Sequence, residues 1–145
     1  KGPPFHFQSR PAHRPDYLVF RRRETPISSS SPPLVGYVQY SKINQDRLLY
    51  LKKHGTGRAI NATPTRWTVD PYFLCHLLAL AQLQEQMLVS TSPKSRLIIT
   101  NVLDSKYIYI YEAQIPRGLL NGLRGLKTAM YPITWPVIRR TKIPF

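Results

Sequence analysis

The chain contains few acidic residues: seven Asp and Glu stand against 21 Lys and Arg, which gives a formal net charge of +14. Its single cysteine, Cys75, excludes an internal disulfide and a cysteine-based zinc cluster. No apolar run reaches the roughly eighteen residues that a membrane-spanning helix needs, so we expect no membrane segment. The four histidines, at positions 6, 13, 54 and 76, lack the spacing of metal ligands, and we expect neither a metal nor a cofactor.

The positive charge favours anionic partners, foremost nucleic acid or a nucleoprotein surface. Basic residues gather in three clusters, which we predict to act as sequence-independent phosphate contacts. The members of these clusters are Arg21, Arg22, Arg23, Lys52, Lys53, Arg58, Arg139, Arg140 and Lys142. The leading hypothesis is therefore a non-enzymatic binding module for a polyanion. The lone cysteine and the lack of a visible signal peptide favour a reducing compartment, so we expect the protein in the nucleus or the cytoplasm.

The N-terminal part of the chain predicts strands between flexible segments. Residues 1–15 are basic and rich in proline, and we predict a flexible extended arm there. Residues 16–143 have the length of a single domain with one core. Within it, apolar stretches at 17–20, 34–40 and 47–52 predict an antiparallel meander, interrupted by a Ser/Pro-rich loop at 25–33.

The clearest structural signal is a buried helix at about 70–88. Asp70 suits the N-cap and Pro71 the first helical position. From Tyr72 to Leu83 only His76 and Gln82 are polar, so two turns of this helix should have no solvent face and lie inside the protein. A hairpin at 96–113, a short leucine-striped helix at about 116–126 and a last strand at 137–143 are predicted after it. Together these signals predict an α+β fold with a mostly antiparallel sheet packed on the 70–88 helix.

Three tyrosines at positions 107, 109 and 111 alternate along the second strand of the hairpin. Such a row either stacks bases, as single-strand-binding sheets do, or belongs to the core. We predict that it packs beneath the leucines of the 116–126 helix. A three-residue turn at 104–106 would place Leu103 opposite Tyr107. The predicted core residues are Leu74, Leu77, Leu78, Leu80, Ala81, Ile98, Val102, Ile108 and Ile110.

Catalytic groups do not assemble from the residues present, so we expect no enzyme. The helix and hairpin invite comparison with PD-(D/E)xK nucleases, in which an Asp and a Glu-x-Lys hold a metal. Asp104 and Glu112 would lie about 25 Å apart along an extended strand, and Gln114 occupies the lysine position. The comparison therefore leaves open only a degenerate nuclease-like fold that has lost its activity. Cys75 and His76 point in different directions on a helix and cannot readily form a nucleophile–base pair.

Two segments together resemble uncharacterised proteins of filamentous fungi. They are the Asp70-Pro71-started helix ending in Leu80-Ala81-Gln82 and the strand element Tyr109-Ile110-Tyr111-Glu112-Ala113. The resemblance covers about residues 60–126 and its motifs are structural. It implies a fungal origin and assigns no site residues. The alternative function is therefore a protein-interaction or scaffold domain of a larger fungal protein, whose other parts would balance the charge.

Overall fold

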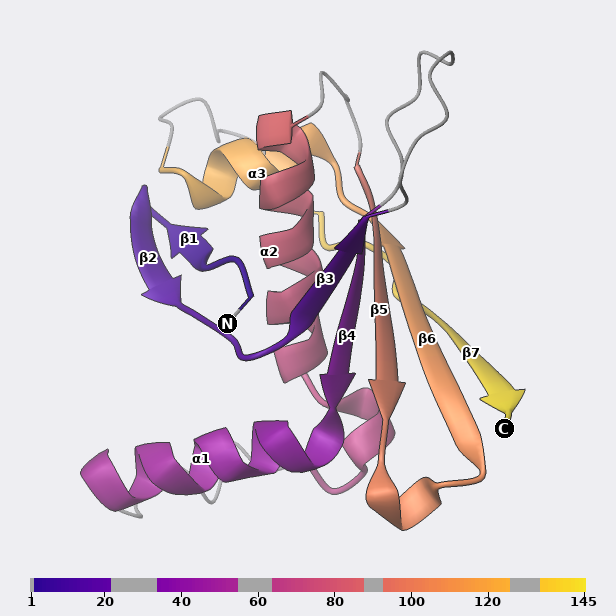
Figure 1. Ribbon diagram of the computed structural model, residues 1–145. Helices are drawn as coiled ribbons and strands as arrows, with labels where there is room; N and C mark the ends of the chain where they lie inside the picture. The colour runs from indigo at the N-terminus through magenta and orange to yellow at the C-terminus, as the bar shows by residue number, and fades with distance from the viewer. Residues whose placement is uncertain (1, 22–33, 55–63, 88–92, 126–133) are drawn as a thin grey trace.

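The computed structural model describes residues 2–21, 34–54, 64–87, 93–125 and 134–145, which form an α+β fold around a five-stranded sheet (Figure 1). The strands follow the order β3 (Leu18–Arg21), β4 (Leu34–Gln39), β5 (Lys94–Thr100), β6 (Tyr107–Gln114) and β7 (Arg139–Pro144). Only β4 and β5 are parallel to each other, and every other neighbouring pair is antiparallel. The predicted fold class is thus confirmed.

One long helix, α2 (Tyr72–Met87), covers a single face of this sheet (Figure 1). Its residues 77–81 are all buried, as the apolar stretch predicts. Against it lie Leu97 and Ile99 of β5, both fully buried, and the rings of Tyr109 and Tyr111 of β6. Tyr109 and Tyr111 therefore belong to the core as predicted, whereas Tyr107 is half-buried at its edge. The Tyr109 ring contacts Trp67 and the Tyr111 ring contacts Phe73. Leucines of the second predicted helix belong to the same core cluster.

The predicted meander is wrong, because residues 47–52 are helical. They belong to α1 (Tyr40–His54), which follows β4 without a turn. Tyr40, Ile43 and Arg47 recur at helical spacing and lie toward the protein, whereas Leu48 and Leu49 are exposed. The chain passes through α1 and α2 before it returns in β5, and this long crossover allows β4 and β5 to run parallel.

The N-terminal residues form an ordered hairpin where we had predicted a flexible arm over 1–15. Strands β1 (Phe5–Phe7) and β2 (Arg10–His13) pair antiparallel. The side chain of Gln82 on α2 accepts a hydrogen bond from the His6 amide and donates one to the His6 carbonyl, both at 2.9 Å. A basic, proline-rich composition does not reveal such a contact, because its partner lies 76 residues away.

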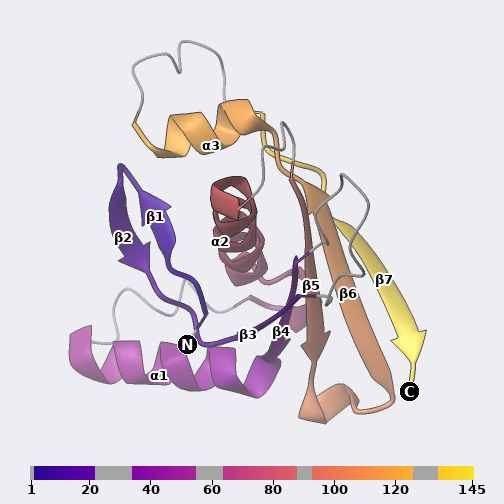
Figure 2. The same ribbon diagram turned by 45° about the horizontal axis from the view of Figure 1, so that its top comes forward.

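All three helices and the hairpin lie on the same side of the sheet (Figure 2). The third helix, α3 (Arg117–Leu123), buries Leu119, Leu120 and Leu123 beside α2. No described helix or strand covers the opposite face, which we call the open face (Figure 2).

The hairpin register differs from the predicted one by two residues. Thr100 pairs with Ile108, because Val102–Asp104 form a 3-10 turn that lengthens the connection. Val102 is exposed rather than in the core, and Ile98, Ile108 and Ile110 are half-buried on the open face. The alternation of the strands was predicted with the correct parity. The assignment of the isoleucine face to the core was wrong.

Two neighbouring residues on β5 test which face is covered. Leu97→Ala empties space under α2 and should cost about 2–5 kcal/mol of unfolding free energy, the range for an enclosed leucine. Ile98→Ala removes a half-buried side chain from the open face and should cost clearly less. Urea denaturation of the two variants measures both values. Equal losses would show that the open face is packed as tightly as the other.

Candidate anion-binding surface

The edge strand β7 carries three cations in six residues, all of them exposed. Arg139 lies on the open face because it pairs with Glu112, whereas Arg140 and Lys142 lie on the α2 side, opposite Tyr111 and Tyr109. The ammonium of Lys142 lies 3.5 Å from the centroid of the Tyr107 ring. None of the described carboxylates forms an ion pair with these three residues. The strand therefore presents three exposed cations without an ion-pair partner among the described residues, although Asp104 attracts Lys142 at longer range.

The outer edge of β7 is blunted against pairing with another strand. The Phe145 amide donates to the Lys106 carbonyl at 2.8 Å, which fixes the hydrogen-bonded positions along the β6–β7 ladder. The backbone groups of Arg140, Lys142 and Pro144 consequently face away from β6, and Pro144 has no N–H to offer. Proline and cations on an edge are a common protection against aggregation. Edge protection is thus the competing explanation for the basic strand.

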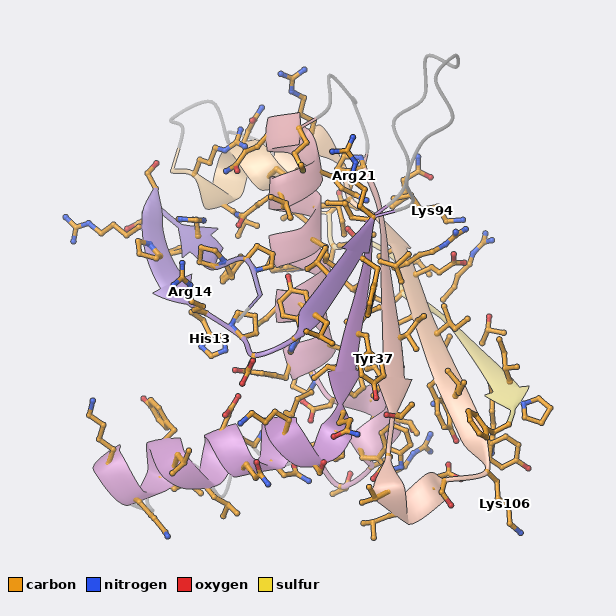
Figure 3. The ribbon with its side chains drawn as sticks, in the orientation of Figure 1. His13, Arg14, Arg21, Tyr37, Lys94 and Lys106 are labelled. Carbon is orange, nitrogen blue, oxygen red and sulfur yellow. The ribbon has the colours of Figure 1, made fainter. Side chains whose placement is uncertain are left out.

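The other predicted clusters lie elsewhere on the molecule. Arg21 ends β3, the opposite edge strand, at the same end of the sheet as Lys94 (Figure 3). Lys52 and Lys53 lie near the end of α1, which extends away from the sheet (Figure 1). The remaining predicted contacts, Arg22, Arg23 and Arg58, fall outside the described residues, as does the 25–33 loop. The described members of the three clusters do not converge on one site.

A pocket of about 510 Å³ lies between the last strand and the start of α2. Arg140 and Arg66 both line it, although 74 positions separate them in the sequence. Its apolar lining includes Phe73, Tyr111 and Ile138. Guanidinium groups bind phosphates and carboxylates in two-pronged fashion, so this pocket suits an anionic group attached to an apolar or planar part. No sequence pattern indicates Arg66 as a site residue, because only the fold brings it close to β7.

Asp70, which also lines the pocket, is already fully engaged. Its buried carboxylate accepts hydrogen bonds from the Tyr72 amide and the Tyr40 hydroxyl, each at 2.9 Å, as well as from the Arg47 guanidinium at 2.5 Å. The first contact is the predicted N-cap, and the others fasten α1 to the start of α2. With its oxygens occupied, Asp70 contributes structure rather than a ligand site.

This buried pair can be tested against an exposed one on the same helix. Arg47→Met leaves the Asp70 carboxylate buried without its cation and should cost about 3–5 kcal/mol of unfolding free energy. Lys42→Met breaks the ion pair with Asp16, in which both side chains are 42% exposed, and should cost less than about 1 kcal/mol. Chemical denaturation compares the two, and similar costs would contradict the structural role given to Asp70.

The residues considered for catalysis are buried or engaged with other partners in the structure. Burial raises the pKa of the Cys75 thiol, which disfavours the nucleophilic thiolate. Asp104 accepts a hydrogen bond from the Tyr109 hydroxyl, while Glu112 on the open face binds Arg96 and Lys94. These two carboxylates therefore have separate partners and do not form the metal pair of a nuclease. Across the described ranges, His, Cys, Asp and Glu side chains form no group of three or more that could hold a metal ion.

His76 is held neutral inside the protein. Its Nδ1 donates to the Tyr72 carbonyl at 2.8 Å, and burial of the ring lowers its pKa to about 4. An unfolded histidine titrates near 6.5, so below that pH the unfolded chain takes up a proton that the folded chain refuses. Stability should consequently fall as the pH drops from about 6.5 toward 4.

A His76→Gln variant measures this loss. Between pH 7 and pH 4.5 the wild type should lose about 2–3 kcal/mol more unfolding free energy than the variant. Comparing the two pH profiles removes the contribution of carboxylates, which titrate in both proteins. Parallel profiles would mean that His76 is accessible to solvent or protonated in the folded state.

No helix in the described ranges has both the length and the apolar character required to cross a membrane. Comparison with known protein families, curated proteins and solved structures found no match for this chain.

Proposed function

We propose that this protein is a non-enzymatic module that binds an anionic polymer, with nucleic acid as the first candidate. The observation that carries the proposal is β7: its three cations are exposed and form no ion pair with a described carboxylate. A chain with a net charge of +14 would attract a polyanion over its whole surface. Within this diffuse electrostatic attraction, β7 and the neighbouring pocket are the site at which we expect phosphates to bind.

The distribution of the acidic residues supports this proposal. Four of the six described carboxylates form ion pairs: Asp16 with Lys42, Asp70 with Arg47, Glu85 with Arg117 and Arg124, and Glu112 with Lys94 and Arg96. The acids thus offset cations in and beside the core, and the cations of β7 remain for an external partner.

Arg66 favours binding over edge protection. Protection of an edge needs charge only on the strand itself, and Arg66 is not part of any strand. It nevertheless lines the same pocket as Arg140. Two guanidinium groups from distant parts of the chain can hold one anionic group, as in many phosphate sites.

The test compares two variants that each remove two positive charges. Arg140→Gln/Lys142→Gln changes β7, and Lys52→Gln/Lys53→Gln changes the end of α1. Fluorescence anisotropy with short labelled DNA and RNA is measured from 50 to 300 mM salt. For the β7 variant we expect weaker binding and a salt slope smaller in magnitude by about 1.4, since each contact to a single strand contributes about 0.7. The α1 variant should lose much less.

Three results would count against the proposal. No binding of the wild type at 50 mM salt would contradict it outright and leave edge protection as the role of the β7 cations. Equal losses in both variants would mean that the charge acts as a diffuse field without a site on β7. A salt slope unchanged in the β7 variant would show that these residues make no phosphate contact.

A protein-interaction domain is the second candidate, because α1 exposes apolar side chains. Leu48 and Leu49 are 59% and 62% exposed on the half of α1 that extends from the protein. They lie apart from β7 (Figure 1). Failure of every oligonucleotide to bind would make this helix the surface to pursue.

A further inference from the structure

The open face of the sheet is unusually apolar for a face that no described helix or strand covers. Leu18 and Phe20 on β3 are 57% and 55% exposed. Ile98 and Ile110, which pair across β5 and β6, form its centre and are half-buried. Antiparallel sheets normally show polar side chains on a solvated face. Soluble proteins rarely expose a continuous apolar surface of this kind to water, so the surface indicates a binding site.

Cations border this apolar area at one end. Arg96 and Arg139 lie on the open face in the same row, on either side of Glu112. Lys94 precedes Arg96 by two residues on β5 and therefore lies on the same face of the sheet. Glu112 binds both Lys94 and Arg96, so this end of the face retains net positive charge. An anionic partner is complementary in charge to these residues. A second copy of the chain would be repelled, because it also carries a net charge of +14.

Two aromatic side chains lie on the β3–β4 side of the face, and Phe20 is in the same row as Arg96 and Arg139. Phe20 pairs with Val35, which stands two residues before Tyr37, so Phe20 and Tyr37 are diagonal neighbours on adjacent strands. The Tyr37 hydroxyl is hydrogen-bonded to Thr100 at 3.1 Å, which restrains the ring. Phe20 has no polar group, and more than half of its surface is accessible.

Aromatic rings on an open sheet beside basic residues are the arrangement with which proteins bind unpaired bases. Each base offers a face for stacking once it is free of a double helix, whereas a duplex hides those faces. From β3 to β7 the sheet spans four strand spacings, about 19 Å, which leaves room for several nucleotides. The tyrosine row of β6 cannot act as the stacking surface, because Tyr109 and Tyr111 are buried.

We propose that the open face binds single-stranded nucleic acid, with a base stacked on Phe20 and phosphates held by Arg96 and Arg139. This proposal rests on the nucleic-acid function proposed above and specifies the kind of strand. The apolar centre around Ile98 and Ile110 would accommodate further bases. Preference for single strands then follows from the stacking, because phosphate contacts alone would accept a duplex as well.

The experiment measures affinity for a labelled twelve-nucleotide RNA and for a duplex of the same sequence, by anisotropy at 100 mM salt. Phe20→Ala should weaken binding of the single strand about 5- to 100-fold, the loss expected for one stacked base. Binding of the duplex should hardly change. Phe20→Trp should keep the single-strand affinity, since it retains a ring. Leu18→Ala is the matched control: it lies on the same strand and face, is equally exposed, and has no ring to lose.

Circular dichroism and thermal denaturation establish that each variant is folded. We expect all variants to fold, because the side chains of Leu18 and Phe20 are exposed. If Phe20→Ala leaves single-strand binding unchanged while the β7 variant weakens it, the stacking proposal is overturned and the proposed function stands. If Leu18→Ala weakens binding as much as Phe20→Ala, the face acts by apolar contact without stacking, which also overturns it. A dimer in sedimentation that Phe20→Ala dissociates would assign the face to a second copy instead. Absence of binding by the wild type would overturn both proposals together.

Discussion

The packing of α2 on a single face of the sheet determines what the rest of the chain can do. Residues 77–81 of this helix are all buried, and Tyr109 and Tyr111 of β6 belong to the same core cluster. The hairpin, α1 and α3 lie around the same helix, so all the described helices and the hairpin are on one side of the sheet (Figure 2). The buried Arg47–Asp70 pair fixes the start of α2 against α1. The isoleucine face and the edge strand β7 remain accessible as a direct consequence.

The same arrangement separates the charges. The few carboxylates hold helices and strands in place: Asp70 caps α2, Glu85 binds cations of α3 and its C-terminal end, and Glu112 binds two cations of β5. Cations without such partners accumulate on β7 and beside the pocket. Arg139 of β7 lies on the open face, whereas Arg140 and Lys142 lie on the other side of the same edge strand. Phosphate contacts at this edge and apolar contacts on the open face are the combination that binding of a single strand requires.

The sequence predicted what depends on local pattern. The Asp70-Pro71 signal predicted the start of α2, and alternation predicted which hairpin residues share a face. Helix α1 and the meeting of Arg66 with Arg140 were not predicted from the sequence. The stretch 47–52 is apolar enough for a strand, and only its continuity with Tyr40 and Ile43 reveals α1. The tyrosines could be buried because their hydroxyls find partners, Thr68 for Tyr111 and Asp104 for Tyr109. Arg66 and Arg140 meet only in the folded chain.

Mapping the contact surface residue by residue would test the central claim most directly. In an NMR titration of the isotope-labelled protein with a short single-stranded RNA, the largest amide shifts should fall on β7, on the first residues of β5 and around Phe20. The amides of Lys52 and Lys53, which are equally basic, should move little. Shifts spread evenly over all basic segments, or confined to α1, would contradict a binding surface built from the open face and its basic edge.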